Sequence, residues 1–130
     1  MEGLATGQKL EGIHVLLVDD DESARHVPEQ ALALCGALVS VSSGPGALRA
    51  ALRADVIVVD LATAEAVGAE FLFQLQRLHS RPNRPVPIIG LAPLGLAIRA
   101  TLRAAGLQRY LLKPVDADEL RAAVVELTRE

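Results

Sequence analysis

The most constraining feature of this chain is a set of short apolar runs that are rich in β-branched residues and do not alternate with polar residues along their whole length. A strand covered on one face alternates apolar and polar residues, whereas a parallel strand covered on both faces is apolar throughout. The sequence therefore predicts a parallel sheet buried between two layers. Its strands are expected at Ile13–Val18, Asp55–Val59, Val86–Leu91 and Tyr110–Leu112, with a weaker one at Leu38–Val41.

Segments with helical periodicity separate these runs. Apolar residues recur at helical spacing at Phe71, Leu72, Leu75 and Leu78, and again at Leu120, Ala123, Val124 and Leu127. Asp116 and Glu119 give the last segment a capping-box-like start. Pro28 falls inside the first helical pattern and predicts a kink or a late start, because proline lacks a backbone donor and clashes with the preceding turn. Regular alternation of strands and helices predicts one doubly wound α/β domain with five helices on both faces of the sheet.

Composition limits the classes of function. The 130 residues fit one domain, with residues 1–11 expected as a flexible tail and residues 12–130 as the folded domain. The tail lacks the apolar region of a secretory signal, and no apolar run is long enough to span a bilayer. A net charge of −3 predicts no direct binding of nucleic acid. Cys35, the single cysteine, is expected as buried packing in a cytoplasmic protein.

Charged residues follow three of the predicted strands. Asp19 and Asp20 come after the first run. Asp60 ends the third run, and Lys113 follows the fifth. Ligands bind at the carboxyl ends of the strands in a doubly wound sheet, so these four side chains are expected to converge there. Three neighbouring carboxylates repel one another unless a cation joins them, and oxygen ligands of this kind suit Mg²⁺.

A simpler interpretation is that each aspartate only caps a strand end or begins a helix, because aspartate is favoured at helix N-caps. That interpretation suffices for any one of these residues taken alone. Four charged residues at the ends of apolar strands, in this order, favour a common site instead. The block of negative charge after the first strand is then one half of a metal site.

Three segments carry a resemblance to a known family: VLLVDDDE at 15–22, VIVVDLA at 56–62 and YLLKPVDADEL at 110–120. Together they resemble the signature segments of response-regulator receiver domains in two-component signalling, over about residues 10–128. The segment CGALVSVSSGPGAL at 35–48 also resembles receivers attached to hybrid sensor histidine kinases. The resemblance implies a flavodoxin-like five-stranded parallel sheet in the order 2-1-3-4-5.

The same resemblance implies a role for each site residue. Asp60 would be the phosphoacceptor, Lys113 would contact the phosphoryl group, and the peptide bond between Lys113 and the following proline would be cis. Asp20, Asp60 and the backbone carbonyl of Ala62 would bind Mg²⁺ directly, with Asp19 acting through water. The domain would accept phosphate from a histidine kinase or a phosphotransfer protein, and would be no enzyme beyond its own phosphorylation and dephosphorylation.

Some positions depart from the pattern of that family. Ala92 stands at the end of the fourth strand, where receivers usually carry Ser or Thr, so a hydroxyl that would bond the phosphoryl oxygen is absent. Tyr110, the aromatic partner in the usual switch, is present, and beside a small Ala92 it is expected to turn inward with or without phosphate. The loop after Asp60 lacks the usual Met-Pro pair, and only Gly68 keeps its expected place.

Three functions stay open on the sequence alone. The acidic residues and Lys113 favour a phosphoacceptor receiver, whereas Ala92 favours a pseudo-receiver that serves as a protein-interaction module. A small α/β enzyme with a Mg²⁺ site is the third, although no acid–base partner is visible. In the family, the fourth helix, fifth strand and fifth helix form a surface for dimers and partners, and Leu94, Leu96 and Ile98 would lie on it.

Overall fold

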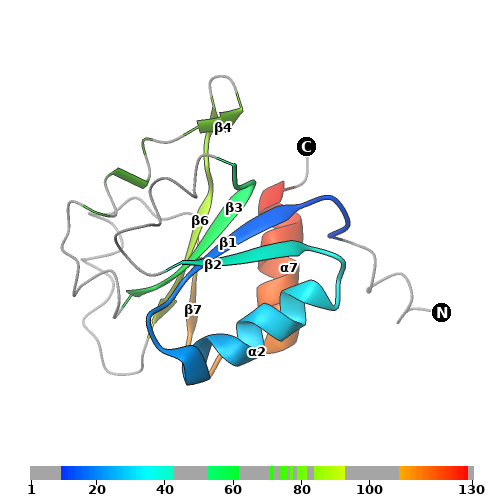
Figure 1. Ribbon diagram of the computed structural model, residues 1–130, viewed down its shortest axis with the longest axis vertical. Helices are drawn as coiled ribbons and strands as arrows, with labels where there is room; N and C mark the ends of the chain where they lie inside the picture. The colour runs from blue at the N-terminus through cyan, green and yellow to red at the C-terminus, as the bar shows by residue number, and fades with distance from the viewer. Residues whose placement is uncertain are drawn as a thin grey trace.

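The computed structural model describes residues 10–42, 53–61, 71, 74–75, 77, 79–81, 84–92 and 109–128. These residues form a five-stranded parallel sheet in the order β2-β1-β3-β6-β7 (Figure 1). Its strands are β1 (His14–Val18), β2 (Leu38–Ser42), β3 (Val56–Asp60), β6 (Ile88–Ala92) and β7 (Arg109–Leu112). Counted along the chain, these five strands have the order 2-1-3-4-5, so the expected flavodoxin-like topology is confirmed.

The burial of each strand follows its place in the sheet. β3 and β6 are buried at every residue, and β1 is buried from its second residue onward. The edge strands β2 and β7 contain partly buried and exposed residues. A strand with a neighbour on one side only needs fewer apolar residues, which explains why the run at Leu38–Val41 gave the weaker signal.

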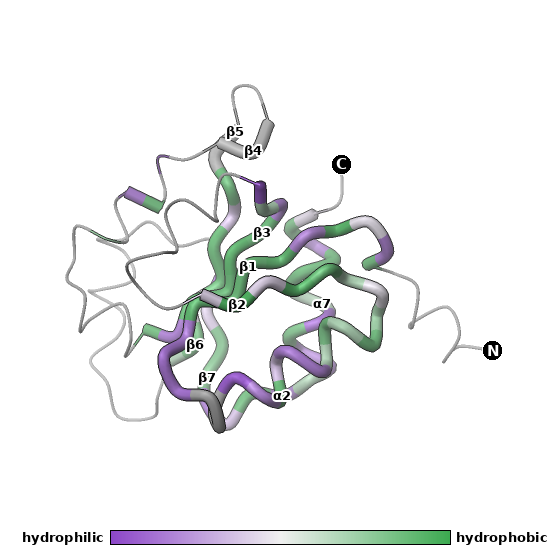
Figure 2. Tube along the Cα trace, viewed as in Figure 1, coloured by the Kyte–Doolittle hydropathy of each residue, from purple (hydrophilic) through white to green (hydrophobic). Residues whose placement is uncertain are grey.

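Two complete helices, α2 (Glu22–Ala33) and α7 (Ala117–Thr128), lie side by side on one face of the sheet (Figure 1). The central strands are coloured as hydrophobic in Figure 2, while the segment between β1 and α2 is strongly polar. Cys35 is 2% exposed and serves as packing, as expected. The core between helices and sheet is aliphatic and consists of Leu10, Val15, Leu17, Leu32, Cys35, Ala37, Val56, Val58, Ile89, Leu91, Leu111, Leu120, Ala123 and Val124.

Each helix begins directly after an aspartate. α2 begins at Glu22 with Pro28 inside it, so the expectation of a late start is wrong. The Asp21 carbonyl accepts the Arg25 N–H at 3.1 Å, which closes the first turn directly behind β1. At α7, the Asp116 carboxylate accepts the N–H groups of residues 118 and 119 at 2.8 and 3.1 Å, in keeping with the capping pattern.

The other predicted helices fall largely outside the described residues. Residues 61, 71 and 74–75 have helical backbone, and Phe71 and Leu75 are buried as their spacing predicts. Leu72 and Leu78 lie outside the described residues. Among the residues described, no helix is long and apolar enough to cross a membrane.

Two features of the fold were not predicted. β4 (His79–Arg81) and β5 (Arg84–Pro85) form a small antiparallel sheet of their own. Leu10, which falls in the expected tail, is only 1% exposed, and its N–H donates to the Cys35 carbonyl at 2.9 Å. Gly36 has a φ of 92°, and a Cβ there would lie 3.2 Å from the Glu11 nitrogen. The chain is therefore packed against the α2–β2 turn from Leu10 onward.

Candidate functional site

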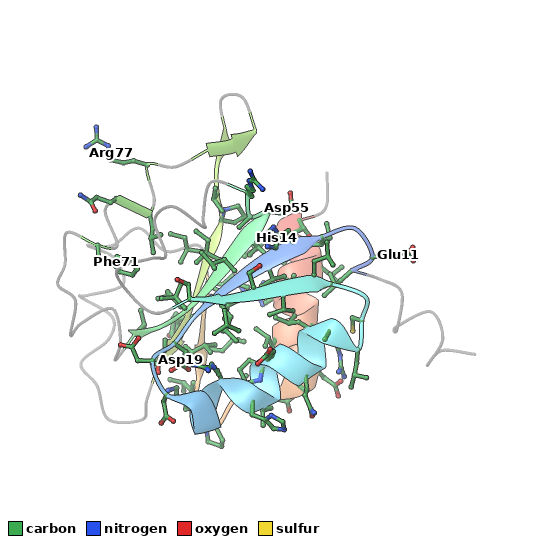
Figure 3. All side chains as sticks on the ribbon, viewed as in Figure 1. Glu11, His14, Asp19, Asp55, Phe71 and Arg77 are labelled. Carbon is green, nitrogen blue, oxygen red and sulfur yellow. The ribbon has the colours of Figure 1, made fainter. Side chains whose placement is uncertain are left out.

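The carboxyl ends of β1 and β3 bring two buried aspartates to one edge of the sheet. Asp19 directly follows β1 and is 1% exposed, and Asp60 is the last residue of β3 and is 4% exposed. The two strands pair in parallel with Val18 opposite Val59. Asp19 and Asp60 are the next residues, so they lie at the ends of neighbouring strands. Figure 3 shows Asp19 where β1 leads into α2. Asp20, the next residue, is exposed.

An ammonium group lies beside the buried carboxylate of Asp60. Lys113 Nζ donates to Asp60 Oδ2 at 3.0 Å. The backbone N–H of Lys113 donates to the Ala92 carbonyl at 2.8 Å, so the pairing of β6 with β7 positions this residue. The peptide bond between Lys113 and Pro114 is cis, which confirms what the resemblance implied. A positive charge is therefore held at the Asp60 carboxylate by the ends of three strands.

The surroundings of the buried Asp19 carboxyl disfavour its ionised form. Its Oδ1 accepts the Asp21 N–H at 2.9 Å, but its Oδ2 is buried and has no hydrogen-bond partner among the described residues. Burial raises the pKa of Asp19 above the ordinary value, and the neighbouring Asp60 raises it further, whereas the Asp21 N–H and the Lys113 charge lower it. A buried polar atom without a partner destabilises a fold by about 1–3 kcal/mol. A proton or a cation at Asp19 would remove this cost.

The donor chemistry of this pair fits a hard divalent cation. Carboxylate oxygens are the ligands that Mg²⁺ prefers, and a cation between Asp19 and Asp60 would relieve their repulsion. No group of three or more His, Cys, Asp or Glu side chains arranged to hold a metal ion occurs in the described part of the chain. The roles expected for Asp20, and for the carbonyl of Ala62 outside the described residues, therefore stay predictions.

The strand next to β3, β6, ends at Ala92, whose side chain is a methyl group. Ala92 is fully buried and lies in register with Leu112 on β7, so its side chain offers no hydrogen bond at this point. Tyr110 is 42% exposed, and the expectation that it turns inward beside Ala92 is not met in this structure. The site thus joins an acid–ammonium pair to a neighbouring position that lacks a side-chain donor.

Arg25 is a site neighbour that sequence reasoning missed. Its Nη1 donates to the backbone carbonyl of Asp19 at 3.4 Å, which is a long hydrogen bond. The contact places a guanidinium beside the acidic segment that follows β1. A cation in the first turn of a helix opposes the helix dipole. A basic residue four positions after Asp21 was therefore the feature of the sequence that could have drawn attention to Arg25.

His14 makes polar contacts at the opposite end of the sheet. Its backbone N–H donates to Asp55 Oδ2 at 2.8 Å. Of the ring nitrogens, Nδ1 lies 3.0 Å from the Arg53 carbonyl and Nε2 lies 2.7 Å from Ser40 Oγ. Figure 3 shows His14 and Asp55 together, far along β1 from Asp19. His14 therefore ties β1 to β2 and to the start of β3, and it takes no part in the acidic site.

Comparison with known sequences identifies the family. The family model described as the response regulator receiver domain matches residues 15–125. A protein described as the probable transcriptional regulator ycf27 of Guillardia theta is 32% identical over 119 residues, which cover 88% of this chain and 45% of that protein. The chain thus spans less than half the length of this curated relative.

Solved structures agree with the sequence match. The receiver domain of the sensor histidine kinase PA1611 from Pseudomonas aeruginosa PAO1, which has a magnesium ion coordinated in its active site cleft, is 29% identical with a TM-score of 0.76, covering 92% of this chain and 99% of that one. The chemotaxis response regulator CheY4 of Vibrio cholerae is 26% identical with a TM-score of 0.73, covering 88% and 98%. This chain therefore belongs to the response regulator receiver domains of two-component regulatory systems.

Proposed function

We propose that this domain accepts a phosphoryl group on Asp60 from a phosphohistidine, with Mg²⁺ bound at the same edge of the sheet. The observation that carries the proposal is the 3.0 Å contact between Lys113 Nζ and Asp60 Oδ2. The buried Asp19 oxygen without a described partner supports a cation beside it. Family membership supports the same role, and a related receiver domain was solved with a coordinated magnesium ion.

The transfer requires little covalent chemistry from the protein. A carboxylate oxygen of Asp60 attacks phosphorus, and the new P–O bond forms as the P–N bond to the donor histidine breaks and its electron pair returns to the imidazole. Such transfer depends on in-line positioning and on neutralising the charge of the phosphoryl oxygens. Lys113 holds one positive charge at the acceptor. Bound Mg²⁺ would supply the remaining neutralisation, with Asp19 and Asp60 among the residues that hold it.

A protein-interaction module that does not respond to phosphorylation is the second candidate. The fully buried methyl group of Ala92 favours it, because this position cannot bond a phosphoryl oxygen through its side chain. Both candidates bind a partner such as a histidine kinase or a phosphotransfer protein. They differ in whether the state of Asp60 reaches the surface.

The partner surface that we propose includes β7 and α7. Tyr110 and Leu112 are 42% and 48% exposed on β7, which supports an apolar contact there. Leu94, Leu96 and Ile98, which were expected on the same surface, lie outside the described residues. A homodimer or a complex with a partner protein could use this surface.

Incubation with acetyl phosphate and Mg²⁺, followed by intact mass spectrometry, tests the phosphoacceptor proposal. The wild type should gain one phosphoryl group, while Asp60→Asn and a wild-type sample in EDTA should gain none. Asp118→Asn is the matched control, because the Asp118 side chain is 85% exposed on α7 and should not affect the reaction. A wild type that takes up no phosphate would leave the interaction module as the function.

A further inference from the structure

The edge strand β2 is the least protected strand of the sheet. In the part of the chain that the structure describes, β2 pairs with β1 alone, so its other edge faces away from the sheet. Natural proteins protect such edges with charged side chains, proline or bulges. β2 has the sequence LVSVS and contains no charge and no proline. The opposite edge strand β7 begins with Arg109 and is followed by Lys113 and Pro114.

The segment of chain that contains β2 also lacks charged residues. Residues 30–42, which include the last four residues of α2 and all of β2, contain no Asp, Glu, Lys, Arg or His. Leu34 in the α2–β2 turn is 72% exposed, and Leu38 at the start of β2 is 66% exposed. Among the described residues, these two are the most exposed large hydrophobic side chains. An uncharged strip with exposed leucines therefore runs along this edge of the molecule.

We propose that β2 pairs antiparallel with β2 of a second copy of this chain, across a two-fold axis near Ser40. A two-fold interface needs a self-complementary surface. Pairing centred on Ser40 sets Val39 of one copy opposite Val41 of the other, and β-branched pairs of this kind stabilise antiparallel strands. Both valines already pack against the core from β2. The paired strands would therefore extend one sheet and one core across both copies.

The distribution of charge favours contact between two copies at the β2 edge. Two molecules with a net charge of −3 repel each other over most of their surfaces. Residues 30–42 bring no charge into the contact, so this edge avoids that repulsion. Leu38 would lose much of its exposure because an antiparallel partner strand runs alongside it. The pairing uses the edge opposite β7 and does not depend on phosphorylation of Asp60.

Sedimentation velocity over a range of concentrations tests the proposal on the whole chain. The wild type should self-associate reversibly, and Leu38→Lys should weaken the association at least about tenfold, because lysine on an edge strand opposes pairing. Val27→Lys is the matched control, since Val27 is 50% exposed on α2 and lies outside β2. Leu112→Lys tests the β7 surface as the competing site of association. Leu34→Lys repeats the test if Leu38→Lys fails to fold. A monomeric wild type, or dissociation by Leu112→Lys alone, would overturn the proposal.

Disulfide trapping tests the strand register. Residues directly opposite in antiparallel strands have Cα atoms about 4.5–5.5 Å apart, which lies within the range of a disulfide. Ser40→Cys should therefore form a cross-linked dimer on mild oxidation. The two copies of residue 38 would lie about 14 Å apart, so Leu38→Cys should not cross-link. Cross-linking of Leu38→Cys in place of Ser40→Cys would contradict the pairing centred on Ser40.

Discussion

Asp19 is the residue at which stability and metal binding oppose each other. Its buried Oδ2 has no partner among the described residues, and it lies near Asp60. We expect Asp19→Asn to raise the unfolding free energy of the metal-free domain at neutral pH by about 1–3 kcal/mol, because it removes a buried charge. The variant should also lose the stabilisation that Mg²⁺ gives to the wild type. Urea unfolding in EDTA and in Mg²⁺ measures both effects, and a variant less stable than the wild type in EDTA would contradict the expectation.

The raised pKa of Asp19 predicts a pH dependence with a definite sign. Because the folded pKa lies above the unfolded value of 3.8, the folded state binds the proton more tightly. Ionised Asp19 therefore opposes folding above the folded pKa, and this penalty disappears as the pH falls through the folded pKa towards 3.8. Without metal, the difference in unfolding free energy between the wild type and Asp19→Asn should be largest at neutral pH and should shrink on acidification. A difference that stays constant over this range would be evidence against the assignment.

Lys113 places a positive charge 3.0 Å from Asp60, the proposed phosphoacceptor. Loss of one donor that stabilises developing charge lowers the rate of such reactions by about 10²–10³-fold. We expect a decrease of this size in the phosphorylation rate of Lys113→Met at saturating Mg²⁺, measured with acetyl phosphate by intact mass. Lys113→Arg keeps the charge and should retain more of the rate. An unchanged rate in Lys113→Met would show that the 3.0 Å contact to Asp60 has no role in the transfer.

At the scale of elements, β6 and β7 are the pair that would carry a signal from Asp60 to the surface. The side chain of Ala92 cannot donate a hydrogen bond, and such a bond to a charged group contributes about 1.5–3 kcal/mol, or roughly 10- to 150-fold in population. Beryllofluoride with Mg²⁺ should therefore shift NMR signals near Asp60 and Lys113 but barely shift those at Tyr110. Ala92→Thr should extend the shifts to Tyr110.

Ala92→Val is the control for this experiment, because valine has the shape of threonine without the hydroxyl. The two variants share any cost of adding volume at a buried position, which is about 1–3 kcal/mol for overpacking. Equal responses in the two variants would mean that size, and not the hydroxyl, limits the coupling. Large shifts at Tyr110 in the wild type would contradict the uncoupled state.

The elements that could be predicted from the sequence are those with a strong local pattern. The interior strands are apolar along almost their whole length because both faces are covered, which made them visible as runs. The pairing of β4 with β5 involves segments of three and two residues and includes Pro85, so no periodicity could reveal it. Leu10 is buried as a single side chain outside any periodic pattern, and only the fold shows its contact with the α2–β2 turn.

The site was predictable to a similar degree. Strand ends and parallel topology were enough to place Asp19, Asp60 and Lys113 at one edge. The exposure of Tyr110 and the absence of a partner for the Asp19 oxygen among the described residues depend on side-chain packing that a sequence does not specify. The contact of Arg25 with the Asp19 carbonyl likewise depends on how α2 leaves the sheet.

At the scale of the whole molecule, the acidic site and the two edges of the sheet are separate surfaces. The acidic site lies at the carboxyl ends of β1 and β3, while the edges of the sheet differ in charge, with an uncharged β2 and a basic β7 end. The aliphatic core under α2 and α7 holds these surfaces in a fixed relation. Phosphorylation chemistry and self-association can therefore be tested separately, by variants at the strand ends and at the β2 edge.

The central claim is that Asp60 is the residue that takes up phosphate. Peptide mapping tests it most directly: the domain is phosphorylated with acetyl phosphate and Mg²⁺, reduced with borohydride to convert an aspartyl phosphate to homoserine, and digested for mass spectrometry. The account predicts homoserine at position 60 and unchanged aspartate at positions 19 and 20. Homoserine at Asp19 or Asp20, or no reduced residue at all, would contradict it.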